Sequence, residues 1–293
     1  MFAASWVLVG DHAQVPEIEA GGAFRGLYER LSAIELHENR RQVEPWEQQA
    51  LTLLRDDRGR DALDEYAAHG RLRAGAHEQL VADWWSAGAP EQSVMLAYRR
   101  ADVAELNARA RERMVRDGAV SGPELLVDGT AFAAGDRVLL RRNDRRIDVA
   151  NGDRGLVTAV DVDRGQLCVR VGEREIVLGR RYLDAPGRPT VQHGYAMTGH
   201  AAQGLTVDRA FVLATEDCSR EWLYMAMSRG RLDNRLYGSP TTIRDRDEIA
   251  PSEPARDAGE VLELAVQRSA AQRMAIDWRV RERGQTRDFG RGR

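Results

Sequence analysis

The sequence has 293 residues, enough for one large or two ordinary domains, and its 43% hydrophobic and 30% charged residues are typical of a folded soluble α/β protein. This composition excludes a disordered chain, and no apolar stretch approaches a membrane span, which favours a cytoplasmic location. The formal net charge of −3 does not by itself indicate a nucleic-acid-binding protein, although a local basic stripe can be hidden in a whole-chain charge. The sequence contains no lysine, so every basic residue is an arginine. Its two cysteines, Cys168 and Cys218, lack metal-ligand spacing, and we expect no metal site.

Short apolar runs alternate with helical patterns in the first 114 residues. Residues 5–9 form an apolar run closed by Gly10 and Asp11, which predicts a central parallel strand whose carboxyl end opens into a loop. A second short strand is predicted at 34–36 and a third at 93–98. Helical periodicity predicts helices over 24–31, 45–54, 80–85 and 103–114.

Between residues 135 and 183 the pattern changes to short strands separated by Gly and Asp turns, which predicts a small β-barrel with strands at 138–140, 156–160, 167–171 and 175–178. The α/β pattern then resumes, with strands at 195–197, 210–213 and 235–237 and a helix over 219–228. A helical stretch over 261–274 and a polar end, expected to be disordered, complete the chain. The barrel is therefore predicted to be an insertion in an α/β domain.

Two segments near the start carry side chains suited to phosphate chemistry. In the loop GDHAQVP (10–16), the Gln14 amide can hydrogen-bond a terminal phosphate or hold an attacking water, although an ordinary tight turn is an equal alternative. In NRRQ (39–42), Arg41 can brace phosphate oxygens. A solvated arginine pair is the more common explanation for NRRQ taken alone in so arginine-rich a chain.

Two later segments are more distinctive. Residues 194–206 place hydroxyls, an imidazole, an amide and glycines between two strands, where small side chains let phosphates approach the backbone. The segment YMAMSRGR (224–231) predicts a helix that ends in two arginines. Arg229 can act as an arginine finger in phosphoryl transfer, or it can simply cap the carboxyl end of its helix and complement the helix dipole.

The order and spacing of these segments resemble the later motifs of superfamily 1 helicases of the RecD-like type, which also form the helicase half of conjugative relaxases such as TraA, TraI and TrwC. GDHAQVP resembles the third motif, NRRQ the fourth, YAMTGHAAQGLT (195–206) the fifth and YMAMSRGR the sixth. The resemblance spans residues 7–237. Residues 135–157 also resemble the start of the SH3-like insertion that this family has before its fifth motif.

The resemblance implies an α/β fold of the RecA-like, P-loop NTPase type. Residues 1–40 would be the end of a first RecA-like domain, and 41–134 with 189–247 would be the second. Residues 135–188 would be an inserted small SH3-like β-barrel, and 248–293 a helical or disordered tail.

The resemblance also implies roles for single residues. Gln14, Arg41 and Arg229 would be catalytic, and Gly10, Asp11 and Gly204 would complete the nucleotide site. Contacts to single-stranded DNA would come from Thr198, His200, Gln203, Thr206, Arg141 and Arg142. The implied cofactors are ATP and Mg²⁺.

Two departures from the family pattern matter. Ala201 stands where the family often has a basic residue. The phosphate-binding loop GxxxxGK[ST] and the acidic magnesium motif, which precede the third motif in the family, are not in this sequence, and without lysine no Walker lysine can lie elsewhere in it. We therefore expect the C-terminal motor portion of an ATP-dependent DNA helicase or translocase, inactive without a fused or separate front portion. The alternative is a non-catalytic DNA-binding module or the relic of a truncated helicase gene.

Overall fold

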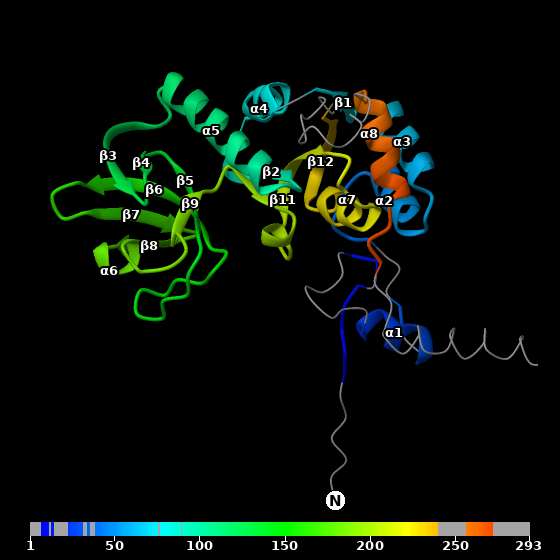
Figure 1. The fold of residues 1–293 in the computed structure, drawn as a ribbon, viewed down its shortest axis with the longest axis horizontal. Coiled ribbons are helices and arrows are strands. Elements are labelled where there is room, and N and C mark those ends of the chain that lie inside the picture. The colour runs from blue at the N-terminus through cyan, green and yellow to red at the C-terminus, as the bar shows by residue number, and fades with distance from the viewer. Residues whose placement is uncertain are drawn as a thin grey trace, which may run out of the picture.

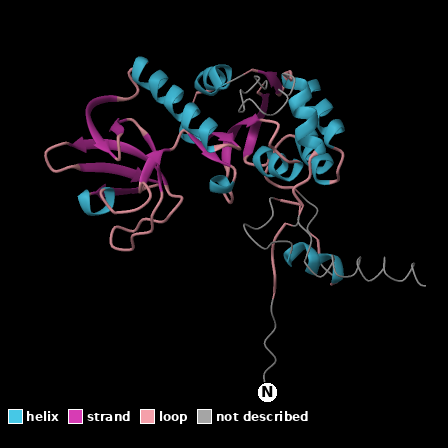
Figure 2. Ribbon diagram, viewed as in Figure 1, coloured by secondary structure: helices cyan, strands magenta, loops and turns pink. Residues whose placement is uncertain are grey.

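The computed structural model describes residues 7–11, 13–14, 23–31, 34–35, 39–75, 77–88, 90–239 and 256–271. Most of these form two bodies that lie side by side, an α/β body with a parallel sheet and an inserted antiparallel β body (Figure 1). In Figure 2, helices flank the strands of the first body, while strands dominate the second. The sequence therefore predicted the α/β class and an inserted β-rich segment correctly.

The parallel sheet has five strands in the order β1-β12-β11-β2-β10. Its central strands are almost wholly buried apolar runs, as expected where helices cover both faces. Four of the five strands were predicted; β1, the missed one, has only three residues, and its central Arg73 is exposed. The strands are β1 (Leu72–Ala74), β2 (Ser93–Ala97), β10 (Ala196–Thr198), β11 (Val207–Ala214) and β12 (Gly230–Gly238).

Helices cover the two faces of this sheet unequally. Successive residues of β2 alternate between the faces, so Val94 packs in one core and Met95 in the other. One face carries α2 (Pro45–Arg55), α3 (Gly59–Ala68), α7 (Arg220–Met227) and α8 (Ala258–Gln267). The other face carries α4 (His77–Ser86) and α5 (Arg100–Arg116), which lie together in Figure 1.

The inserted body contains a five-stranded antiparallel sheet in the order β8-β7-β6-β5-β9, with β8 and β9 at its open ends. A β3–β4 hairpin packs against β6, and the two sheets enclose a separate apolar core around Phe132 and Val169. Its elements are β3 (Ser121–Val127), β4 (Thr130–Ala134), β5 (Arg137–Leu140), β6 (Arg154–Asp161), β7 (Gln166–Val171), β8 (Arg174–Leu178), α6 (Arg180–Leu183) and β9 (Val191–His193).

The two ends of the chain differ most from the prediction. Val7 and Val9 are 84% and 90% exposed and belong to no strand, so the strand predicted at 5–9 is wrong for residues 7–9; residues 5 and 6 lie outside the described part. A buried parallel strand needs paired neighbours, and no described strand lies beside this segment. Ile34, also predicted in a strand, is 95% exposed and irregular, whereas helix α1 (Ala23–Arg30) forms as predicted.

The C-terminal helix is shorter than the sequence predicted. Helix α8 begins with a capping box formed by Asp257 and Glu260 and ends at Gln267, where Arg268 turns to extended backbone. The predicted continuation beyond residue 271 lies outside the described residues. Among the helices that the structure describes, none is long and apolar enough to cross a membrane.

Candidate functional site

The loop at residues 10–14 is tied to helix α7 through Asp11. The Asp11 carboxylate accepts hydrogen bonds from the backbone N–H of Ala13 (3.0 Å), the Gln14 side-chain amide (3.1 Å) and the Tyr224 hydroxyl (3.1 Å). Tyr224 belongs to α7, so the segments that resemble the third and sixth motifs meet here. The Gln14 amide, expected to face a phosphate, is held by its own loop in this conformation.

The segment at 41–43 is tied to the end of the same helix. Arg41 donates to the Ser228 carbonyl oxygen at 2.8 Å. The buried amide of Gln42 donates to the carbonyl oxygens of Ser228 (3.1 Å) and Gly230 (2.8 Å). Gln42 was not predicted as a site residue, because its partners lie nearly two hundred positions away in the chain and spacing alone gives no sign of them.

Arg229 is almost fully enclosed, with 2% of its surface exposed. Its Nε donates to the Met225 carbonyl oxygen (2.8 Å) and its NH2 to the Ser228 hydroxyl (2.7 Å), which is the geometry of a helix C-cap. Burial, followed by the nearby charge of Arg41, lowers the pKa of Arg229 to about 10, so the guanidinium is still charged at neutral pH. No described carboxylate forms an ion pair with it, and a phosphate contact stays a prediction.

The two predicted glycines of the nucleotide side have different surroundings. A Cβ at Gly10 would meet the Phe24 ring at 3.0 Å, so a side chain there would push against α1. Gly204 has a φ of +85°, a conformation that suits glycine, and lies in open space. It precedes Leu205, whose carbonyl oxygen is 3.5 Å from the NH1 of Arg229. We call Asp11, Gln14, Arg41, Gly204, Tyr224 and Arg229 the arginine cluster.

A second feature lies where the inserted body faces the loop after β10. It is a hollow of about 370 Å³. Of the predicted DNA contacts, Arg141, His200 and Gln203 line it. The other three do not: Arg142 and Thr206 are exposed elsewhere, and the Thr198 hydroxyl accepts the backbone N–H of Ala201 at 3.4 Å.

Further lining residues come from the turn before β6. Asn151, Gly152 and Arg154 belong to the segment NGDRG, which lies within the stretch that resembles the start of the SH3-like insertion. The hollow therefore joins one loop of the inserted body to the short 3₁₀ turn η2 (His200–Ala202). Among the lining residues that the structure describes, none is an Asp or a Glu.

Gly199 connects the hollow to the arginine cluster. A Cβ at this position would lie 2.4 Å from both the Trp222 ring nitrogen and the Met225 methyl group, so only glycine lets η2 pack on α7. Met225 is also the residue whose carbonyl oxygen accepts from Arg229. A shift of α7 would therefore be felt directly by the loop that lines the hollow.

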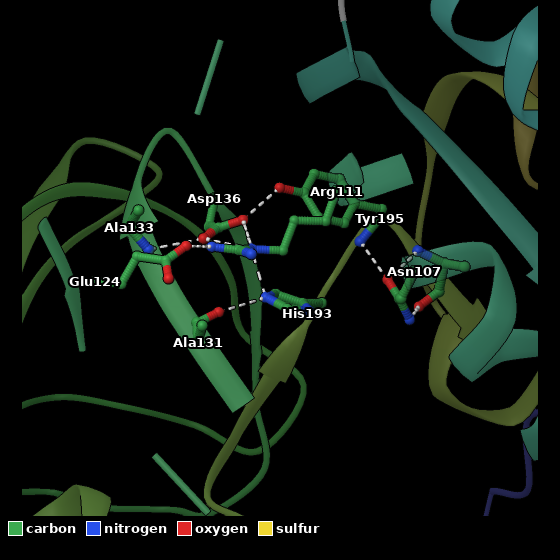
Figure 3. Close-up of polar contacts among 9 residues, drawn as sticks. Asn107, Arg111, Glu124, Ala131, Ala133, Asp136, His193 and Tyr195 are labelled. Atoms are coloured by element: carbon green, nitrogen blue, oxygen red, sulfur yellow. Dashed lines mark hydrogen bonds and ion pairs between the residues drawn. The ribbon is translucent and has the colours of Figure 1, made fainter. Parts of the chain in front are cut away.

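The orientation of the inserted body is fixed by a buried polar joint (Figure 3). Asp136, fully buried just before β5, accepts from Arg111 Nε (3.1 and 3.2 Å), the Tyr195 hydroxyl (2.7 Å) and the backbone N–H of Ala133 (2.7 Å). Burial, followed by the charge of Asp136, raises the pKa of Tyr195, so its hydroxyl keeps the proton that it donates. Arg111 comes from α5, so the joint ties the inserted body to the α/β body.

Two more residues complete the joint. The Asn107 side chain accepts from the backbone N–H groups of Tyr195 (3.0 Å) and Ala196 (2.9 Å) and donates to the Ala196 carbonyl oxygen (3.0 Å). A ring nitrogen of His193 lies 3.1 Å from the Ala131 carbonyl oxygen, and burial lowers the pKa of His193. Asn107 thus fixes the backbone at the start of β10, the strand that leads into the hollow.

No group of three or more His, Cys, Asp or Glu side chains suitable for a metal ion occurs within the described part of the chain. The arginine cluster can hold an anion, because the positive charges of Arg41 and Arg229 lie near each other and the Asp11 carboxylate already accepts three hydrogen bonds. Its residues therefore fit a phosphate group and do not fit Mg²⁺.

Comparison with known proteins gives consistent matches. A family model described as "AAA domain" matches residues 3–77. The conjugal transfer protein TraA of Rhizobium radiobacter is 37% identical over 245 residues, which cover 80% of this chain and 22% of TraA. The RecBCD enzyme subunit RecD of Mycobacterium tuberculosis is 32% identical over 120 residues, or 39% of this chain and 20% of RecD. The chain thus spans about a fifth of the length of these relatives.

Among solved structures, the Pif1 helicase from Bacteroides in complex with ADP-AlF3 and single-stranded DNA has a similar fold. The TM-score is 0.50 at 20% identity, and the match covers 69% of this chain and 51% of that one. At this identity the likeness concerns the fold.

Proposed function

We propose that this chain, which belongs to the RecD-like superfamily 1 helicases, is the C-terminal motor portion of an ATP-dependent DNA helicase or translocase acting on single-stranded DNA. The observation that carries the proposal is the convergence of three distant segments, at residues 10–14, 41–43 and 224–230, on one cluster with two arginines. We expect it to act in conjugative DNA transfer or recombination, because it is similar in sequence to relatives named for conjugal transfer and for RecBCD.

On the nucleotide side, Arg41 and Arg229 would contact the terminal phosphate of ATP, and Gln14 would sense it after leaving its hydrogen bond to Asp11. Charge that develops on the transferred phosphoryl group is stabilised by such guanidinium groups. Bound ATP would supply the phosphoryl group. The Mg²⁺ ligands and the lysine that grips the phosphates would come from a front portion, because this sequence has no lysine.

On the DNA side, Arg141, His200 and Gln203 would contact the strand in the hollow, with the antiparallel body as an SH3-like insertion. Arg142, Thr198 and Thr206 lie outside the hollow and would act at its margins or through the fold of the loop. Movement of α7 would reach the strand through the contact of Gly199 with Trp222 and Met225. This contact gives a physical route between phosphate and DNA.

A non-catalytic DNA-binding module is the second candidate. The burial of Arg229 as a helix cap favours it, because a cap needs no nucleotide. The two candidates predict different results when a front portion is added: only the motor portion should then hydrolyse ATP.

The test compares this chain alone with the same chain fused or mixed with a front portion that carries GxxxxGK[ST] and the acidic motif. We expect no DNA-stimulated ATPase from the chain alone and clear turnover from the combination. A combination that binds DNA and nucleotide but does not hydrolyse ATP would favour the non-catalytic module. Turnover by the highly purified chain alone would refute the assignment of the missing groups to a front portion.

A further inference from the structure

Arg154, the first residue of β6, is a partly buried cation without an acidic partner among the described residues. Its NH2 donates to the Ser93 carbonyl oxygen at 3.0 Å, and no described carboxylate lies within ion-pair distance. Burial, followed by the charge of Arg137, lowers the pKa of Arg154 to about 10. Arg137 itself is paired with Glu91 at 2.9 Å. Burying a charge is costly unless a counter-charge accompanies it, so a bound anion would compensate the charge of Arg154.

The position of Arg154 gives that anion a place. Arg154 lines the hollow of about 370 Å³, together with Arg141 on the same body and His200 and Gln203 on the opposite loop. None of the described residues that line the hollow is acidic, so this part of its wall would not repel a negative group. Gly152 has no side chain to obstruct the approach.

We propose that Arg154 anchors a binding site for one backbone phosphate of single-stranded DNA. The inference rests on the proposed DNA-binding function. It adds a positively charged contact, Arg154, that is not among the six DNA contacts implied by the family resemblance. A guanidinium can hold two phosphate oxygens at once. Arg141 is exposed beside the hollow, and three more exposed arginines, Arg142, Arg145 and Arg146, follow in the same loop. Several exposed cations in the loop that contributes to the site suit a polyanion better than a free phosphate ion.

Arg154→Met provides the test, because methionine keeps an unbranched apolar stem and removes the charge. Binding of the full chain to a fluorescent oligothymidylate is measured across a salt series. We expect affinity to fall about tenfold at low salt, as for a lost charge-assisted hydrogen bond. The slope of log affinity against log salt should become shallower by about 0.7, the value for one single-strand phosphate. The matched control, Arg164→Met, removes an exposed arginine that does not line the hollow and should leave both values unchanged.

Thermal unfolding without DNA separates this role from a structural brace. Removing an uncompensated buried charge should leave the melting midpoint unchanged or raise it, whereas loss of a brace to Ser93 should lower it. A lower midpoint together with unchanged DNA affinity and slope would overturn the inference and leave the proposed function intact. Wild-type chain that binds no oligonucleotide at low salt would overturn the proposed function and this inference with it.

Inorganic phosphate at matched ionic strength, with chloride as reference, distinguishes the source of the anion. We expect it to compete with the oligonucleotide only weakly, because it engages one site of several. Complete competition at millimolar concentration, lost in Arg154→Met, would mean that the site takes free phosphate, and would overturn the assignment to DNA.

Discussion

Two arginines of this chain, the partly buried Arg111 and the fully buried Arg229, occupy different electrostatic environments. Arg111, in the joint, is paired with Asp136 and with Glu124, the latter at 2.7 Å. Burial alone would lower the pKa of Arg111, but the two carboxylates outweigh burial, and the pKa is raised. Arg229 hydrogen-bonds only neutral groups, and burial beside Arg41 lowers its pKa to about 10. We therefore expect that the paired cation stabilises the fold, whereas the unpaired one is available to a ligand.

Arg229→Ala should have the largest effect, and on turnover. In the chain combined with a front portion, we expect the rate of ATP hydrolysis to fall by about three to five orders of magnitude, because the guanidinium acts on charge that is greatest in the transition state. Loss of the helix cap alone should cost about 1 kcal/mol of stability or less. Arg229→Lys should restore little, because lysine lacks the planar fork.

The rate and the melting midpoint are measured on the same Arg229→Ala sample. A normal rate per folded molecule would remove the arginine finger and much of the case for a motor. A large loss of stability instead would place Arg229 with Arg111 as a structural cation, and the comparison would fail.

Arg111→Leu should show the opposite pattern. It leaves the fully buried Asp136 carboxylate without its cation, and breaking a buried pair in this way costs about 3–5 kcal/mol. Urea unfolding of the chain measures this loss directly. The control is Arg116→Leu on the same helix, which breaks only an exposed pair with Glu112 and should change stability by about 0.5 kcal/mol or less. Equal effects of the two variants would mean that the joint adds nothing to the fold.

The sequence predicted the elements whose pattern is local. Strands β2 and β11 are apolar runs, and α7 is capped at its start by Ser219, whose hydroxyl accepts the backbone N–H of Trp222. The sequence does not show which distant strands pair in a sheet. For this reason the exposed residues 7–9 were predicted as a strand. Helix α3 was missed, although its buried residues Gly59, Ala62, Leu63 and Tyr66 repeat at helical spacing; only two of them, Leu63 and Tyr66, are large and apolar.

The sequence indicated some of the residues that the structure brings together, while their functional roles stay predictions. The side chains of Arg41 and Arg229, recognised as motif residues, do meet at the end of α7. Gln42 and Arg154 were missed because their importance lies in burial and in distant partners, Ser228 in one case and Ser93 in the other. A sequence shows which residue types are present, whereas an unpaired buried charge can be recognised only in three dimensions.

Glu47 extends the comparison to an acid. It is 1% exposed on α2, and its carboxylate accepts from the Asn234 side chain at 2.8 Å. Burial raises its pKa from 4.5 to about 7, with smaller lowering effects from Asn234 and Arg71. Because the folded state then binds the proton more tightly than the unfolded state, the stability from this group is complete below about pH 4.5 and is lost as pH rises to about 7.

Glu47→Gln removes this titration and keeps an oxygen that can accept from Asn234. At pH 8 the variant should therefore be more stable than the wild type by up to ~3 kcal/mol, the equivalent of the pKa shift, and the gain should shrink toward pH 4.5. The difference in unfolding free energy between the two proteins, measured from pH 4.5 to 8, cancels the contributions of the other titrating groups. Glu263→Gln, an exposed acid on α8, is the control and should give a nearly flat difference. A flat difference for Glu47→Gln would mean that Glu47 is compensated like Asp136 and holds the fold as a charged group.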